Sequence, residues 1–290
     1  MSDERQFSAR QWLQSVLAKA LIGGLLLLPY RLRVPLCGFI VSRVVGPLAG
    51  YNQRVRDNLA QVMPQLSQSE VKRIASAVPD NVGRTLIEIY SGQEFIDRAT
   101  AFPLSGPGLA QLEQAKAAGR PVILATGHFG NYDAVRACLI AQGYPVGALY
   151  RPLNNAYLNT HYVRAISQIG EPVFPRGKKG MAAMLRFLRG GGMLGILHDQ
   201  HMSHGEPLMF FGQEALTAVS AAELALKYDA LLIPIYGVRQ ENRLDFKILV
   251  EQPIPHGDAV QMTQDLNDNL EKVVRENIDQ WFWIHRRWKR

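Results

Sequence analysis

From about residue 105 onward, short segments rich in apolar residues alternate with longer segments of helical composition, and this alternation constrains the fold more than any other feature. The short segments are residues 121–126, 145–150, 171–176, 193–198 and 231–238. The helical segments are residues 106–120, 131–143, 156–170, 179–192 and 218–230. Strands alternating with helices of 10–15 residues predict βαβ units, and strands without a polar face predict a sheet covered on both sides.

Two further segments complete the predicted core. Residues 243–250 predict a strand antiparallel to 231–238, and residues 262–283 predict a long amphipathic helix. Residues 51–100 are of helical composition, and Pro79 is expected to interrupt them. The predicted fold class is therefore α/β, with a mixed, mostly parallel sheet flanked by helices, and ligands are expected at the carboxyl ends of the strands.

The N-terminus carries a separate signal. Residues 12–30 are largely apolar but include Lys19, and residues 34–50 are apolar again with one arginine. A spanning helix needs about 20 apolar residues, so the pattern favours a membrane anchor or helices lying on a membrane. A pair of helices buried against the core is the alternative. We therefore predict a hydrophobic segment at 1–50 and an α/β domain at 51–290.

Charge, cysteines and missing motifs narrow the function. A formal net charge of +7 favours acidic partners such as phosphorylated head groups, an anionic membrane or carrier protein, or nucleic acid. Two distant cysteines, Cys37 and Cys138, predict no disulfide framework and a reducing compartment. The chain has no GxSxG elbow, no GxxxxGK[ST] loop and no GxGxxG after a strand, so a serine hydrolase and a nucleotide-binding protein lack support.

The turn "TGHFGNYD", residues 126–133, follows the first apolar strand and is the main candidate site. An imidazole oriented by a carboxylate can act as a general base on a hydroxyl, which predicts His128 as base and Asp133 as its hydrogen-bond partner. Backbone N–H groups near Gly130 and Asn131, at the start of the next helix, could stabilise an oxyanion. The plainer interpretation is a loop histidine and a helix N-terminal charge.

Basic and capping residues follow other predicted elements. Arg151 and Arg176 each follow a strand and could hold phosphate, although both could equally be surface arginines. Thr217 is predicted to cap a helix beside the cleft, and Asn154 and Asn155 to cap another. Phe210 and Phe211 could line an acyl channel or pack in the core. The C-terminal "WFWIHRRWKR" is typical of a membrane interface, with RNA binding as a competing use.

The ordered set of motifs resembles the lipid A biosynthesis late acyltransferase family. The resemblance rests on "TGHFGNYD", "YRPLNN", "FPR", "LHDQ", "FFGQEALT" and "QWFWIHRRWK", and runs from about residue 15 to the end. It implies acyl transfer from acyl carrier protein or acyl-CoA to a hydroxyl of an anionic glycolipid or phospholipid. It also implies a position on the cytoplasmic side of the inner membrane, and it marks Asp199 and Gln200 as residues near the active site.

Departures and alternatives remain in the pattern. Lipid A enzymes usually carry HxxxxE, whereas this chain has Asp133, so a lysophospholipid or a glycosylated phosphoinositide is an alternative acceptor. His198, His201 and His204 could suggest a metal-dependent hydrolase, but their segment is a strand end and loop, and we expect neither metal nor cofactor. We expect no nucleic-acid partner. The alternative in a different class is a non-catalytic membrane-binding protein.

Overall fold

The computed structural model describes residues 8–289, and its core is a seven-stranded sheet in the order β1-β9-β8-β2-β5-β3-β4. The strands are β1 (Leu104–Ser105), β2 (Val122–Thr126), β3 (Val146–Tyr150), β4 (Val173–Pro175), β5 (Met193–Leu197), β8 (Leu231–Arg239) and β9 (Phe246–Val250). All neighbours are parallel except β8 and β9, which pair antiparallel. The predicted fold class and the one antiparallel pairing are confirmed.

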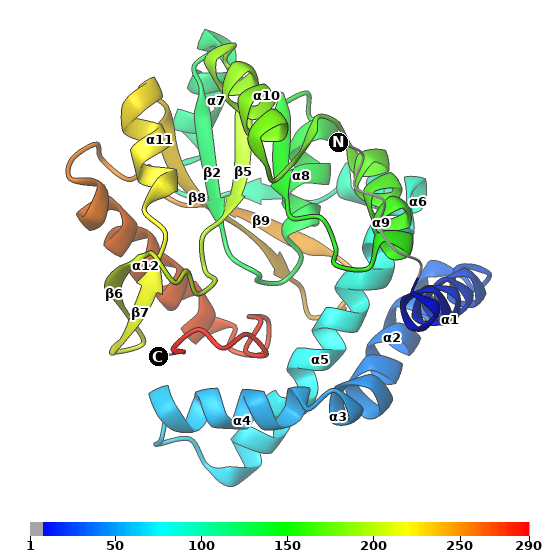
Figure 1. Cartoon of the computed structure of the whole chain (residues 1–290). Coiled ribbons are helices and arrows are strands. Elements are labelled where there is room, and N and C mark those ends of the chain that lie inside the picture. Colours follow the sequence, from blue (N-terminus) through cyan, green and yellow to red (C-terminus); the bar gives the residue numbers. More distant parts are fainter. Residues whose placement is uncertain (1–7, 290) are drawn as a thin grey trace.

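Helices cover both faces of the sheet (Figure 1). Alternate residues of β2 point to opposite faces, so Val122 and Leu124 join one core cluster and Ile123 the other. The first face is covered by α6 (Gln93–Ala99), α7 (Leu109–Ala118), α8 (Tyr132–Ala141) and α9 (Ala156–Ile169). The second is covered by α10 (Lys178–Arg189), α11 (Ser220–Tyr228) and α12 (Ala259–Glu276). This two-sided burial explains the lack of polar residues in the central strands.

The long helix α5 (Gln68–Tyr90) runs past the carboxyl ends of the strands, and α4 (Tyr51–Val62) precedes it (Figure 1). A capping box between Ser67 and Glu70 starts α5. The predicted interruption at Pro79 is wrong, because the helix continues through this residue. Proline removes one backbone hydrogen bond, but ten residues of α5 are buried, and that packing stabilises the helix through Pro79.

The C-terminal segment differs most from expectation. Helix α12 ends at Glu276, and the chain beyond it packs against a two-stranded hairpin, β6 (Glu206–Phe210) and β7 (Gln213–Thr217), for which the sequence pattern predicts no strands. Trp281, Trp283 and Trp288 are 1%, 0% and 7% exposed, and their rings contact those of Phe210 and Phe211. The predicted membrane-interface role of these tryptophans is therefore wrong, and both phenylalanines serve core packing.

The N-terminal helices are α1 (Ala9–Leu26), α2 (Tyr30–Ile40), a π-helical segment η1 (Val41–Val45) and the short α3 (Gly46–Leu48). They pack on α5 and α9 but leave a large apolar surface uncovered. Its exposed side chains are Trp12, Leu13, Val16, Leu17, Leu21, Leu27, Leu32, Leu36, Phe39, Val44, Val45 and Leu48. Within residues 8–289 no single helix has the length and apolar composition to cross a membrane. The segments Tyr30–Leu48 and Tyr51–Val62, which meet at an angle of 82°, together have that length and composition. The outermost residues of both predicted segments, 1–7 and 290, lie outside the described residues.

Candidate active site

The site forms where β2 and β5 end side by side. These parallel strands pair in register, with Thr126 opposite Leu197. Two residues beyond each strand come His128 and Asp199, so the register alone brings the imidazole and the carboxylate to the same edge of the sheet. His128 Nδ1 lies 2.7 Å from Asp199 Oδ1, and the backbone N–H of His128 donates to Asp199 Oδ2 at 2.7 Å.

A third donor completes the surroundings of Asp199. Trp281 Nε1 donates to Asp199 Oδ2 at 2.9 Å, from the buried C-terminal segment. Burial by itself raises the pKa of this carboxyl, but the electrostatic attraction of the His128 ring and the hydrogen bonds from His128 outweigh burial and hold the pKa of Asp199 well below its usual range. Asp199 is therefore ionised, and it holds the imidazole in the tautomer with the proton on Nδ1.

The other ring nitrogen of His128 contacts Gln200. The amide nitrogen of Gln200 lies 3.3 Å from His128 Nε2, a contact that suits an unprotonated Nε2 accepting a hydrogen bond. The side chain of His128 is 26% exposed while that of Asp199 is 2% exposed. A buried carboxylate behind an accessible imidazole is the arrangement of a general base that takes a proton from a bound hydroxyl.

Asp133 does not contact His128 as the sequence suggested, and that predicted hydrogen bond is wrong. Its Oδ1 accepts hydrogen bonds from Arg136 Nε at 2.9 Å and pairs with Arg136 Nη2 at 2.8 Å. Asp133 lies in the first turn of α8, and Arg136 is one turn further along the same face, so the nearer cation takes the carboxylate. Arg136 also donates to the carbonyls of Ile166 and Gly170, which ties α8 to the end of α9.

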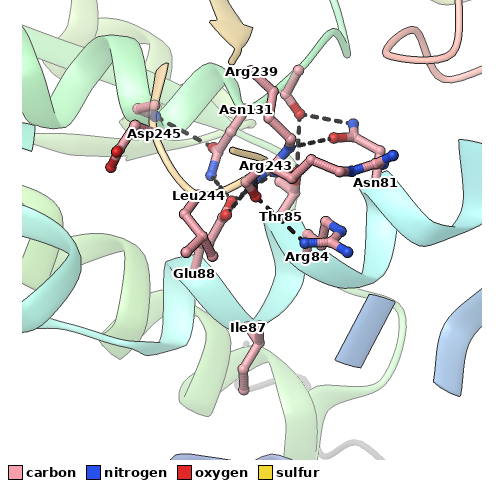
Figure 2. Close-up of polar contacts among 12 residues, drawn as sticks. Asn81, Arg84, Thr85, Ile87, Glu88, Asn131, Arg239, Arg243, Leu244 and Asp245 are labelled. Atoms are coloured by element: carbon pink, nitrogen blue, oxygen red, sulfur yellow. Dashed lines mark hydrogen bonds and ion pairs between the residues drawn. The ribbon is translucent and has the colours of Figure 1, made fainter. Parts of the chain in front are cut away.

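The turn that carries His128 is fixed from behind by a buried polar network, shown in Figure 2. Asn131 caps α8 and donates to Glu88, whose carboxylate pairs with Arg239 at 2.5 Å. Asn81 donates to the carbonyl of Gly130 at 3.0 Å and accepts from Arg239. Side chains of Glu88 and Arg239 are 0% and 2% exposed. These contacts hold the turn to α5 and β8, and explain the full burial of Asn131.

The proposed oxyanion donors are already engaged. The N–H of Gly130 donates to the carbonyl of Gln280 at 2.9 Å, and the N–H of Asn131 donates to the carbonyl of Gly237. Gly130 has φ +52°, and a side chain there would overlap the Gly237 carbonyl, so glycine is required by close approach. The predicted oxyanion role of these two N–H groups is contradicted, although Gly130 does line a pocket beside His128.

Two pockets meet at His128. A polar one of about 350 Å³ is lined by His128, Asp133, Arg136, Arg151 and Gln200, among others. An apolar one of about 210 Å³ lies between α5 and residues 280–282, with Val78, Val82, Leu86 and Ile89 in its wall. Tyr132 and Tyr162 line both. Figure 1 shows α5 passing beside the strand ends, and the imidazole of His128 lines both pockets.

The remaining predicted residues fall in different places. Arg151 lines the polar pocket and donates to Asn154, while Asn155 caps α9 as expected. Arg176 is exposed, and its backbone N–H donates to the Tyr150 carbonyl. Thr217 is not a helix cap, because it ends β7, is fully buried and accepts a hydrogen bond from Arg287. The N-cap of α11 is Val219, which forms no side-chain cap.

Metal ligands do not gather in the described part of the chain. No group of three His, Cys, Asp or Glu side chains within residues 8–289 lies close enough to hold a metal ion. His198 is buried, and the backbone N–H of His201 donates to His285 Nε2 at 2.9 Å. The spacing of His198, His201 and His204 in the sequence thus does not produce a shared site.

Comparison with known proteins gives a consistent result. A family model described as bacterial lipid A biosynthesis acyltransferase matches residues 3–290. A lipid A biosynthesis acyltransferase of Haemophilus influenzae is 22% identical over 263 residues, covering 88% of this chain and 81% of that protein. A phosphatidylinositol mannoside acyltransferase of Mycobacterium tuberculosis is 22% identical over 245 residues, covering 82% and 78%. A lipid A biosynthesis lauroyltransferase of Escherichia coli is also 22% identical, over 241 residues, covering 81% and 78%. The identity is the same to relatives named for two kinds of acceptor.

Proposed function

The chain belongs to the bacterial lipid A biosynthesis acyltransferase family and is an acyltransferase, and we propose that it acylates a hydroxyl of a phosphorylated glycolipid such as a lipid A precursor. The donor is a fatty acyl thioester, carried on acyl carrier protein or on CoA. The observation that supports this proposal most directly is the accessible imidazole of His128 at the junction of a polar and an apolar pocket, backed by the buried Asp199.

The proposed mechanism uses only side chains of this site. His128 Nε2 removes the proton of the acceptor hydroxyl as its oxygen forms a bond to the thioester carbonyl carbon. Asp199 stabilises the resulting imidazolium through Nδ1. The tetrahedral intermediate then expels the thiolate, the carbon–sulfur bond breaks, and the imidazolium returns its proton to the sulfur. The products are the acylated lipid and the free thiol, with no net change at His128.

The two pockets divide the substrates in this proposal. The apolar pocket beside α5, with Gly130 in its wall, accepts the acyl chain next to the thioester. The polar pocket accepts the head group, and Arg151 is the guanidinium best placed to bind a phosphate there. Arg136 is already bound to Asp133, so Asp133 shapes this pocket by holding Arg136 in place. Arg176 is exposed and follows β4, which pairs with β3, and Arg151 follows β3. In this proposal Arg176 binds an outer anionic group of the donor or the acceptor.

A second acceptor has support from the comparisons. Relatives named phosphatidylinositol mannoside acyltransferases are as similar in sequence as the lipid A enzymes. A mannosylated phosphoinositide also combines sugar hydroxyls with a phosphate, so the same polar pocket could receive it. Mass spectrometry of lipids from cells lacking the gene separates these acceptors, because each loses an acyl chain from a different parent mass.

The same proposal includes membrane attachment. The exposed apolar side chains of α1–α3 form the surface expected of helices that lie at a bilayer interface. We assign residues 1–50 to this attachment and residues 51–290 to catalysis, at the cytoplasmic side of the inner membrane where acyl thioesters are made. The 82° bend between Tyr30–Leu48 and Tyr51–Val62 favours lying on the bilayer rather than crossing it as one straight helix.

The test compares His128→Ala with His204→Ala, an exposed histidine that lines neither pocket. Thiol release from an acyl thioester is followed in the presence of candidate acceptors. The proposal expects His128→Ala to lose turnover by at least about 10³-fold with an unchanged melting temperature, and His204→Ala to retain it. If His128→Ala transfers acyl chains normally, His128 is not the base. If the wild type and both variants bind membranes but none of them transfers acyl chains, the result favours the non-catalytic alternative.

A further inference from the structure

A basic groove lies on the outer side of α5, away from the proposed active site. It has a volume of about 580 Å³ and runs between α5 and the helices α2 and η1. Five cationic side chains and one anionic side chain line it, namely Arg43, Lys72, Arg73, Arg84, Arg243 and Asp80. Lys72, Ser76 and Asp80 face this groove, whereas Val78, Val82 and Leu86 of the same helix face the apolar pocket. The helix therefore separates the groove from the pocket.

Most of the positive charge in the groove is uncompensated. Asp80 neutralises part of it by pairing with Arg84 at 2.6 Å and Arg243 at 2.9 Å. Arg73 forms only an exposed contact of 3.7 Å with Asp279, and such surface pairs contribute little. Arg43 and Lys72 are exposed, and neither has an ion-pair or hydrogen-bond partner within residues 8–289. The groove thus presents free cationic donors to an incoming anion.

An apolar stripe leads into this groove. Leu32, Leu36 and Phe39 are spaced three or four residues apart on α2, so they lie along one side of the helix. They are 58%, 39% and 58% exposed, and Phe39 also lines the groove. Arg43, four residues after Phe39, continues the stripe as its charged end. Exposed apolar residues that finish at a cluster of cations match a molecule with an acyl tail and an anionic head.

We propose that this groove binds the phosphate head group of an anionic phospholipid in the bilayer on which the protein docks. Arg43 and Lys72 contact the phosphate, and Leu32, Leu36 and Phe39 lie against the acyl region beside it. An acidic carrier protein would match the charge, but it would leave the exposed stripe of α2 and the wider apolar face of α1–α3 uncovered. The inference rests on the proposed membrane attachment and not on the assignment of the catalytic site.

The test measures flotation of the full chain with vesicles of phosphatidylcholine alone and with vesicles that also contain phosphatidylglycerol. The variant is Arg43→Gln with Lys72→Gln. Its control is Arg189→Gln with Lys227→Gln, which removes the same formal charge from exposed positions on α10 and α11, in the upper part of Figure 1 and far from α2. We expect the wild type and the control to prefer phosphatidylglycerol, and the groove variant to lose roughly 30-fold in that preference, about fivefold per cation.

Four results would overturn the proposal. Equal losses in both double variants would mean that overall charge, rather than the groove, attracts the lipid. Equal binding of wild type to both vesicle types would refute the head-group site while leaving apolar attachment intact, and binding to neither would refute both. The fourth is a groove variant that keeps its lipid preference and loses turnover with a donor on acyl carrier protein, but not with acyl-CoA. That result would assign the groove to the carrier protein.

Discussion

Replacing Asp199 by Asn changes one atom of the proposed dyad and should still disable it. Two donors, the His128 backbone N–H and Trp281 Nε1, both point at Oδ2 of residue 199. They fix the amide oxygen of the asparagine at that position, so the NH2 group must face His128 Nδ1. The imidazole can then only accept at Nδ1, which moves its proton to Nε2 and leaves no lone pair toward the hydroxyl.

The expected loss of turnover can be set from this tautomer change. In serine proteases the same Asp-to-Asn exchange behind a catalytic histidine lowers kcat by about 10⁴, or roughly 5 kcal/mol of activation free energy. We expect Asp199→Asn to lose about 10³- to 10⁴-fold in kcat, with little change in KM. Steady-state thiol release measures kcat, and ¹⁵N NMR of the imidazole reports directly which nitrogen carries the proton.

The matched variant is Asp133→Asn, which the sequence pattern alone would make equally damaging to the tautomer. In the structure Asp133 binds Arg136, and both side chains are almost fully buried. Removing one member of a buried ion pair lowers the free energy of unfolding by about 3–5 kcal/mol. Asp133→Asn should therefore lower the urea midpoint while its folded fraction keeps the His128 tautomer. The reasoning is refuted if Asp133→Asn loses turnover at unchanged stability and Asp199→Asn remains active.

Three further predictions concern residues around the dyad. Trp281→Phe keeps an aromatic side chain but removes one donor to Asp199, so kcat should fall about tenfold without loss of the fold, measured by turnover and near-UV circular dichroism. Glu88→Gln breaks the buried pair with Arg239 and should lower the free energy of unfolding by about 3–5 kcal/mol in urea titrations. Burial lowers the pKa of His285 to about 4, against about 6.5 when unfolded, despite the opposing charge of Asp199. Because the unfolded state binds the proton first, stability should decline by about 2–3 kcal/mol as pH falls from 6.5 to 4, and His285→Gln should flatten this decline.

The fold could be predicted well from sequence because the strong patterns were local. Short apolar segments between helices predict the central strands and their order along the chain, and residues 243–250 predict the strand that pairs antiparallel with β8. The hairpin at 206–217 could not be recognised, because its strands have polar and charged residues and are stabilised by packing against the C-terminal tryptophans. Those tryptophans looked interfacial because their neighbours are basic, yet buried Arg287 finds its partners inside the protein.

The candidate site shows where local patterns stop being informative. His128 was found because it follows a buried strand and precedes a glycine, whereas Asp199 was reached only through the family resemblance. No local pattern could pair Trp281 with Asp199, since the two residues lie 82 positions apart in the sequence. The five-residue spacing of His128 and Asp133 suggested a contact that α8 does not allow. Where a helical side chain points depends on its neighbours one turn away, and here that neighbour is Arg136.

The register of two parallel strands explains why the dyad and the HxxxxD spacing are separate requirements. With Thr126 opposite Leu197, the second residue after β2 lies beside the second residue after β5, so the carboxylate partner of His128 follows β5 and does not come from α8. Asp133 is then free to bind Arg136, which in turn binds the carbonyls at the end of α9 and closes one wall of the polar pocket. One carboxylate thus orients the imidazole, and the other holds the pocket wall. A glutamate at position 133 could therefore serve the wall as well as an aspartate, provided that it still reaches Arg136.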